Sequence, residues 1–214
     1  MNVVVCLPTM NEVESIREMI RQIRAEGYDL FVVDAGSTDG TREIAQDLGV
    51  TVYDRAFPGK GIGLQKALDV CAEQGYDRMA YIDCDLTYPV DRIPEMVELS
   101  KEYDLVIGAR AMKNITLTHR IANTVYNNMV NILFAAHYLD INSGLRVLHV
   151  AKFRGLLDAE DFDIEAQTCC RAMKRGYEVK DIEIAYGDRT GSSKVVVRHA
   201  FEIFFRILWE RLTK

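Results

Sequence analysis

Two aspartates in the middle of the chain, Asp83 and Asp85, are separated by a single residue and follow a short apolar run. On a strand this spacing places both carboxylates on one face, with Cys84 on the other. At an effective dielectric constant of about 20 the two carboxylates would repel each other by roughly 2–3 kcal/mol. Mg²⁺ or Mn²⁺, which prefer oxygen ligands, would reverse that repulsion and bridge the carboxylates to a diphosphate. Taken alone, however, the pair favours a solvated loop with a capping aspartate.

A second polar segment, residues 8–12 (Pro-Thr-Met-Asn-Glu), follows the first strand-like run. Thr9 and Glu12 have the spacing of a capping box, so locally this segment is best interpreted as a helix start. The same segment lies at the carboxyl end of a strand, where backbone N–H groups and the Glu12 carboxylate can meet a ribose or a base.

Two further loops carry an acid and a base. Asp34 directly follows an apolar run and precedes the turn at 36–41, whose own polar residues suit a turn and a helix cap. A carboxylate at the end of a parallel strand usually accepts from a ligand or a donor, so we expect Asp34 to contact a base or ribose. Gly59-Lys60-Gly61 resembles an anion cradle but lacks the spacing of a P-loop. A phosphate contact by Lys60 and a simple glycine turn both stay open.

The elements that must position these loops are short apolar runs alternating with amphipathic stretches. This alternation predicts βαβ units and a mostly parallel sheet with helices on both faces. In such sheets ligands bind at the carboxyl ends of the strands, where all four loops lie. The predicted strands are 3–7, 30–33, 50–53, 79–83, 105–107 and 177–184, and the predicted helices are 11–25, 41–48, 63–73, 93–101, 119–136, 162–175 and 195–212.

Composition limits the function classes. A chain of 214 residues with 49% hydrophobic and 27% charged residues fits one α/β domain spanning 1–214. The net charge of −6 argues against nucleic-acid binding, which needs a surplus of Lys and Arg. The five cysteines form no C-x-x-C pair, and no apolar run reaches the roughly 20 residues that span a bilayer. We expect a cytoplasmic protein whose membrane contact, if any, is peripheral on the cytoplasmic face.

Together these loops resemble the family 2 glycosyltransferases with the GT-A fold, and most of all the group of dolichol-phosphate mannose synthases. The likeness covers nearly the whole chain. Segments 8–12, 33–41, 59–61 and 83–86 resemble the family's P-x-x-N-E, V-D-D-G-S-x-D-G-T, G-K-G and D-A-D-L. Segments 108–110, 140–144 and 189–194 resemble its G-S-R, its D-x-x-S-G and its basic segment ending in G-x-S-K.

The resemblance implies a role for each half of the domain. Residues 1–112 would bind a GDP- or UDP-sugar, 113–194 the acceptor, and 195–214 would form an amphipathic helix. The implied metal ligands for Mg²⁺ or Mn²⁺ are Asp83 and Asp85, and the implied catalytic residues are Asp85, Arg110 and Arg189. The implied nucleotide-sugar contacts are Pro8, Thr9, Asn11, Glu12, Asp34, Lys60 and Asp83. The implied ligands of the acceptor phosphate are Arg110, Arg120, Arg189 and Lys194, since guanidinium groups bind phosphate oxygens in pairs.

Three positions depart from the family pattern. Ala35 replaces the second aspartate of the D-D pair, so Asp34 would carry the nucleotide contact of that strand end. Thr87 stands where relatives often carry Gln, which leaves the third metal ligand open. Arg146 stands in a segment where an aromatic residue is expected after Gly144, and hints at a different acceptor or sugar.

The implied reaction moves a sugar, mannose or glucose, from the nucleotide-sugar to a polyprenyl or dolichyl phosphate with inversion. A phosphate monoester is already an anionic nucleophile, so positioning and charge neutralisation suffice. A glycan hydroxyl acceptor would instead need a general base, for which Asp140, Asp163 and Glu165 are candidates. A sugar-nucleotide pyrophosphorylase lacks support because its G-x-G-T-R loop is missing. A nucleotide-sugar-binding protein without catalysis is the remaining alternative.

The last predicted helix poses a separate question. Residues 198, 202, 206 and 210 form a charged stripe, and the rest of the helix presents a wide apolar face. Burial of each large apolar side chain contributes about 1.5–3 kcal/mol, so this face should not stay in water. It would pack on its own domain, pair with a second chain in a homodimer, or lie in a membrane surface.

Overall fold

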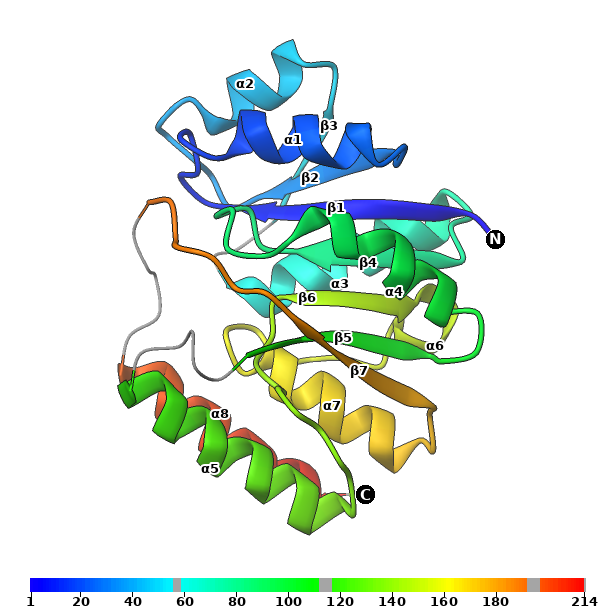
Figure 1. The fold of residues 1–214 in the computed structure, drawn as a ribbon, viewed down its shortest axis with the longest axis vertical. Coiled ribbons are helices and arrows are strands. Elements are labelled where there is room, and N and C mark those ends of the chain that lie inside the picture. Colours follow the sequence, from blue (N-terminus) through cyan, green and yellow to red (C-terminus); the bar gives the residue numbers. More distant parts are fainter. Residues whose placement is uncertain (56–58, 112–116, 192–196, 214) are drawn as a thin grey trace.

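The computed structural model describes residues 1–55, 59–111, 117–191 and 197–213 (Figure 1). Its centre is a seven-stranded sheet in the order β3-β2-β1-β4-β6-β5-β7. The strands are β1 (Val3–Thr9), β2 (Leu30–Asp34), β3 (Thr51–Asp54), β4 (Arg78–Ile82), β5 (Leu105–Arg110), β6 (Leu145–His149) and β7 (Val179–Ile184).

All neighbouring strand pairs are parallel except the two that involve β6, which runs antiparallel between β4 and β5. The predicted mostly parallel α/β sheet is therefore confirmed, but β6 was missed. Because β6 runs antiparallel to β4, its first residue, Leu145, pairs with Ile82 at the end of β4. The start of β6 thus lies at the same edge of the sheet as the carboxyl ends of the parallel strands (Figure 1).

Helices cover both faces of the sheet (Figure 1). They are α1 (Ile16–Ala25), α2 (Thr41–Asp47), α3 (Lys60–Glu73), α4 (Ile93–Leu99), α5 (Leu117–Phe134), α6 (Val150–Phe153), α7 (Ile164–Lys174) and α8 (Val197–Leu212), with a short 3₁₀ turn η1 (Val90–Arg92) before α4. One apolar core packs α1, α2 and α4 against the sheet, and the other packs α3, α5, α7 and α8 against its opposite face. None of the helices in the described part of the chain combines the length and apolar character needed to cross a bilayer.

The predicted capping box at Thr9 and Glu12 is wrong. Thr9 is the last residue of β1, and its hydroxyl donates to the Asp34 carboxylate at 2.8 Å. The backbone turns once more before α1 begins at Ile16, with the Glu12 carbonyl accepting from the N–H groups of Ser15 and Ile16. Thr9 therefore joins two strand ends rather than starting a helix.

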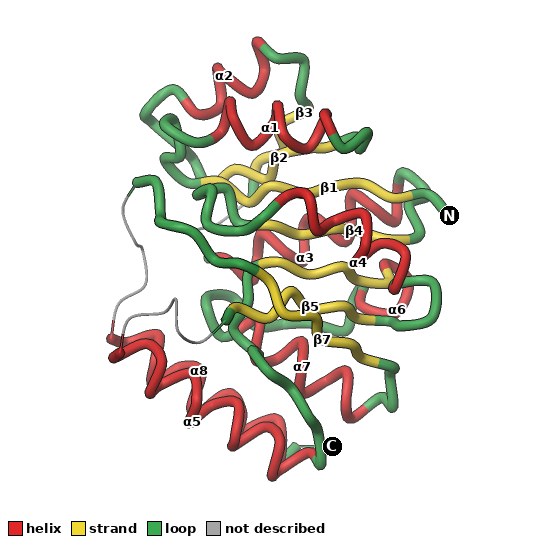
Figure 2. The backbone as a smooth tube through the Cα atoms, viewed as in Figure 1, coloured by secondary structure: helices red, strands yellow, loops and turns green. Residues whose placement is uncertain are grey.

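Helices α5 and α8 lie side by side along one end of the molecule (Figure 2). The later part of the charged stripe of α8 faces inward, since Glu210 is 1% exposed and binds Arg171 and Lys174 of α7, whereas Arg198 at its start is exposed. The apolar face points outward, with Phe201 62%, Phe205 62%, Trp209 61% and Leu212 84% exposed. These four side chains therefore do not pack on their own domain. A surface helix usually turns its apolar side chains toward the core, so this face of α8 has the opposite orientation.

Candidate active site

A cavity of about 1060 Å³ opens where the parallel strands end. Its walls come from the ends of β1, β4, β5 and β7, from the start of α3, and from α5 and α8. Among the predicted site residues, it is lined by Pro8, Thr9, Glu12, Lys60, Asp83, Asp85, Arg110 and Arg189. Segments from both halves of the chain are therefore brought together, as the position of the polar loops predicted.

Asp83 and Lys60 both line this cavity and form an ion pair. The Lys60 ammonium lies 2.8 Å from an oxygen of Asp83 and 2.6 Å from one of Glu165. Burial alone would lower the pKa of Lys60, but these two carboxylates raise it well above its ordinary value. Lys60 is therefore a permanent cation within reach of whatever Asp83 binds.

Two glycines make this arrangement sterically feasible. A Cβ on Gly144 would lie 2.1 Å from the Asp83 carboxylate, and one on Gly61 would lie 2.1 Å from the carbonyl oxygen of Ala159. Gly61 lets the first turn of α3 approach the loop before α7. Close approach, rather than turn formation alone, explains the glycine after Lys60.

Asp85 is held by two neighbours. Its Oδ1 accepts from the Thr87 hydroxyl at 2.5 Å and from the Thr87 N–H at 3.1 Å. Its Oδ2 lies 2.7 Å from the Arg189 guanidinium. Burial would lower the pKa of Arg189, but Asp85 raises it above its ordinary value. Thr87 thus orients the Asp85 carboxylate, and the Thr87 hydroxyl is engaged by this carboxylate in this structure.

Arg110 is the second guanidinium at the cavity. Asp140, which is fully buried, binds it in bidentate fashion, with distances of 2.6 and 2.9 Å. The guanidinium also lies over the Tyr186 ring, 5.3 Å from its centroid. Burial opposes its charge, but Tyr88 and Asp140 raise its pKa well above the ordinary value. Arg110 is therefore rigidly oriented, and Asp140 engages only two of the N–H donors of its guanidinium group.

Three of the predicted site residues that the structure describes do not line the cavity. Asp34 is fully buried, and its carboxylate accepts from Thr9, Ser37, Arg42 and two backbone N–H groups. Asn11 bonds to the turn at 37–38, and Arg120 is exposed on α5. Lys194 lies outside the described residues. A nucleotide contact by Asp34 or Asn11 stays a prediction, as does a phosphate contact by Arg120.

Arg146 cannot select a sugar or an acceptor by direct contact, because it is 1% exposed. Its guanidinium donates to the carbonyl oxygens of Ser143, Ile141 and Glu165. It thereby ties the loop that carries Asp140 to the start of α7. In this structure Arg146 fixes backbone behind the cavity, and the interpretation of this position as a sign of different specificity stays a prediction.

Several cavity residues were not predicted from the sequence. Tyr88 belongs to the Asp83 loop and accepts a hydrogen bond from the Gly144 N–H at 2.7 Å. Its place in that loop was a signal that could have identified it. Four others lie inside predicted motif segments without having been singled out: Met10, Gly59, Cys84 and Asn142. The rest come from segments without a predicted motif: Arg55, Ala122, Asn123, Tyr126, Asp161, Phe162, Tyr186, Arg198, Ala200 and Ile203. Glu165, a candidate base from the sequence, also lines the cavity.

The fold and the site together define an α/β protein with a charged cavity where the parallel strands end, which is where such sheets bind their ligands. Residues 4–159 match the model of glycosyl transferase family 2, and the chain belongs to this family. It is therefore a glycosyltransferase, which sets aside the pyrophosphorylase and the non-catalytic alternatives.

Two relatives and one solved structure illustrate the likeness. The chain is 32% identical over 198 residues to glycosyltransferase AglJ of Haloferax volcanii, covering 88% of this chain and 65% of that protein. It is 27% identical over 199 residues to a dolichyl-phosphate hexose transferase of the same organism, covering 89% and 85%. Glucosyl-3-phosphoglycerate synthase of Mycobacterium tuberculosis, crystallised with Mn²⁺, UDP and phosphoglyceric acid, superimposes with a TM-score of 0.81 at 20% identity, covering 100% and 79%. The likeness confirms the GT-A-type fold.

Proposed function

We propose that this chain transfers a hexose from a nucleotide-sugar to a polyprenyl or dolichyl phosphate. The observation that carries the proposal is the composition of the cavity at the carboxyl ends of the strands. Its lining includes Asp83, Asp85 and Arg189 together with residues of α5 and α8. The outer faces of those two helices carry the exposed apolar side chains, so a lipid with an anionic head would meet both kinds of surface.

The carboxylates of Asp83 and Asp85 fit Mg²⁺ or Mn²⁺. Both line the cavity and both offer hard oxygen donors. In this structure the cations Lys60 and Arg189 lie against them, which indicates a position where positive charge is stabilised. A bound metal would supply charge neutralisation for the departing nucleoside diphosphate. The names of the solved neighbours, which contain Mn²⁺ or Mg²⁺ with UDP, support the same assignment.

The chain's own residues would orient the acceptor. Arg110 is fixed by Asp140 and presents its remaining N–H groups to the cavity. Arg189 lies close to Asp85 and would hold the attacking phosphate near the leaving group. Two guanidinium groups neutralise the phosphate and position it, so an anionic nucleophile needs no general base.

A glycan hydroxyl acceptor is less well supported, because it needs a base that faces the substrate. Asp140 is fully buried and bound to Arg110, and Asp163 is bound to Arg206. Neither lines the cavity. Glu165 does, but it forms an ion pair with the Lys60 ammonium, which lies 2.6 Å away, so this carboxylate is already engaged.

The test combines the protein with Mn²⁺, labelled GDP- and UDP-sugars and dolichyl phosphate. Labelled lipid is expected with one donor, and Asp85→Asn should reduce its formation by about 100-fold or more, as for loss of a group that stabilises developing charge. Asp91→Asn, at an exposed position, is the matched control. Labelled sugar acceptors in place of lipid would support the hydroxyl alternative. Absence of labelled lipid with every donor would overturn the proposal.

A further inference from the structure

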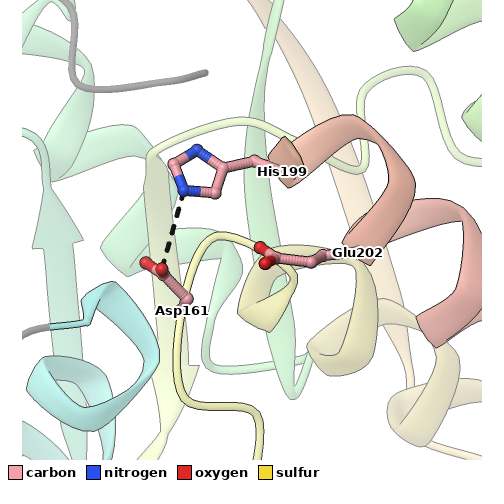
Figure 3. A group of neighbouring side chains, drawn as sticks. All are labelled: Asp161, His199 and Glu202. Atoms are coloured by element: carbon pink, nitrogen blue, oxygen red, sulfur yellow. Dashed lines mark ion pairs between the residues drawn. The ribbon is translucent and has the colours of Figure 1, made fainter. Parts of the chain in front are cut away.

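A histidine and two acids converge beside the cavity, outside the Asp83 and Asp85 site. His199 and Glu202 come from the first turns of α8, and Asp161 comes from the loop before α7 (Figure 3). One ligand atom from each lies within 4.8 Å of the other two. Asp161 also lines the cavity, and His199 is 4% exposed.

The spacing is close to that of a metal site. Ligand atoms about 2.0–2.1 Å from a tetrahedral ion lie roughly 3.4 Å apart. His199 Nε2 and Asp161 Oδ2 are 3.6 Å apart, longer than a good hydrogen bond and close to that edge. The imidazole stacks on Phe162, with ring centroids 4.4 Å apart, so its orientation is fixed.

Glu202 supplies the second observation. Its Oε2 atom is buried without a hydrogen-bond partner among the described residues, although its Oε1 is 2.9 Å from Arg198. A buried carboxylate oxygen without a donor costs free energy unless a cation meets it. Figure 3 shows this carboxylate directed toward Asp161 and His199.

Arg198 at present balances part of the charge, since it lies 3.4 Å from Asp161 as well as beside Glu202. Its side chain is 69% exposed, so it can turn into water at the cost of these two ion pairs, whose carboxylates a bound cation would then meet. A divalent ion would then balance both carboxylates. A set of one imidazole and two carboxylates suits Zn²⁺ or a similar transition metal rather than Mg²⁺.

We propose that Asp161, His199 and Glu202 bind a Zn²⁺-class ion that fastens the first turns of α8 to the loop before α7. The site is separate from the one formed by Asp83 and Asp85, and its ligand chemistry differs. It does not depend on the proposed acceptor, because its occupancy is measured without substrate.

The experiment uses the full chain, freed of metal by a chelator and kept in excess Mg²⁺ to fill the oxygen-ligand site. Calorimetric titration with Zn²⁺ should show one ion per chain, and Co²⁺ should give the visible absorption of a tetrahedral complex. Glu202→Gln and Asp161→Asn keep the shape of each side chain but remove its charge, and each should weaken Zn²⁺ binding more than about tenfold. Zn²⁺ should raise the melting temperature of the unaltered protein but not of these variants.

Two controls separate this site from others. Glu95→Gln, at an exposed position on α4, and the double variant Asp83→Asn with Asp85→Asn should bind Zn²⁺ as the unaltered chain does. Circular dichroism checks that each variant is folded. Unchanged Zn²⁺ affinity in folded Glu202→Gln, or loss of binding only in the Asp83 and Asp85 variant, would overturn the proposal, as would absence of Zn²⁺ binding by the unaltered chain.

Discussion

At the scale of single residues, the site depends on close approach as much as on charge. Asp83 is fixed between the Lys60 ammonium and the bare backbone of Gly144. A methyl group at position 144 would overlap the carboxylate, but a carboxylate at the end of a side chain can rotate away. The overlap should therefore affect function more than folding.

Gly144→Ala tests this reasoning. Displacement of the Asp83 carboxylate should weaken Mn²⁺ binding in the presence of UDP by about tenfold or more, while the melting temperature changes little. Isothermal titration calorimetry measures the Mn²⁺ affinity, and differential scanning calorimetry measures the melting temperature. Gly187→Ala is the matched control, because a Cβ there would meet its nearest atoms at 3.7 and 3.8 Å, which is ordinary contact. Equal Mn²⁺ affinities in the two variants would contradict the role given to Gly144.

At the scale of elements, β7 carries an acid in an unfavourable position. Asp181 accepts a hydrogen bond from the Leu139 N–H, and its other carboxylate oxygen is buried without a partner among the described residues. Burial raises the pKa of Asp181 from 3.8 to about 6. Its charge at neutral pH therefore destabilises the join between β7 and the segment after α5.

The pH dependence follows from this shift. Between about pH 4 and pH 6 the unfolded chain has lost the Asp181 proton and the folded chain still holds it, so the free energy of unfolding falls as the pH rises. The loss is half complete near the folded pKa of about 6 and levels off roughly one pH unit higher. Asp181→Asn keeps an acceptor for Leu139 and should raise the free energy of unfolding at pH 7 by about 1–2 kcal/mol, allowing for partial exposure. Urea titrations at pH 4 and pH 7 measure this, and a pH-independent effect would disprove it.

Elements also differ in how well the sequence predicts them. The parallel strands that precede the polar loops were predicted closely, because each is an apolar run that ends at a charged or glycine-rich turn. The strand β6 was missed because Arg146 interrupts its apolar run and because its partners β4 and β5 come earlier in the chain. Only the return of the chain between two existing strands makes this segment a strand.

At the scale of the whole molecule, the site was predicted in part. The polar loops at strand ends were expected to meet, and the cavity contains residues from most of them. The ion pairs of Lys60 with Glu165 and of Arg189 with Asp85 join segments far apart in the sequence, so no local pattern indicates them. Asp34 was expected to contact the ligand, yet in this structure its carboxylate oxygens accept hydrogen bonds from Ser37 in the turn that follows it. Whether such an aspartate faces a ligand or its own turn depends on its burial and not on its residue type.

The outer face of α5 and α8 is apolar and exposed, so the whole molecule needs a partner surface that covers it. Phe201, Phe205 and Trp209 of α8 point outward beside a groove of about 500 Å³ that is lined by both helices. The inner faces of these helices line the candidate active-site cavity. A membrane surface that supplies a lipid phosphate would cover the apolar face and deliver the acceptor to the cavity at once, whereas a second chain would only cover the face.

Vesicle sedimentation distinguishes these arrangements. The unaltered chain should bind phospholipid vesicles, and replacing Phe201, Phe205 and Trp209 by serine should weaken that binding by roughly 100-fold or more, since each large apolar side chain contributes about 1.5–3 kcal/mol when fully buried. Leu139→Ser, at an exposed position outside α5 and α8, is the control. Light scattering of the unaltered chain without lipid should report a monomer. The apolar face would instead be assigned to a second chain if the unaltered protein is a dimer, the serine variant is a monomer and neither binds vesicles. The two arrangements exclude each other, because one apolar face cannot be buried against a second chain and in a membrane at the same time.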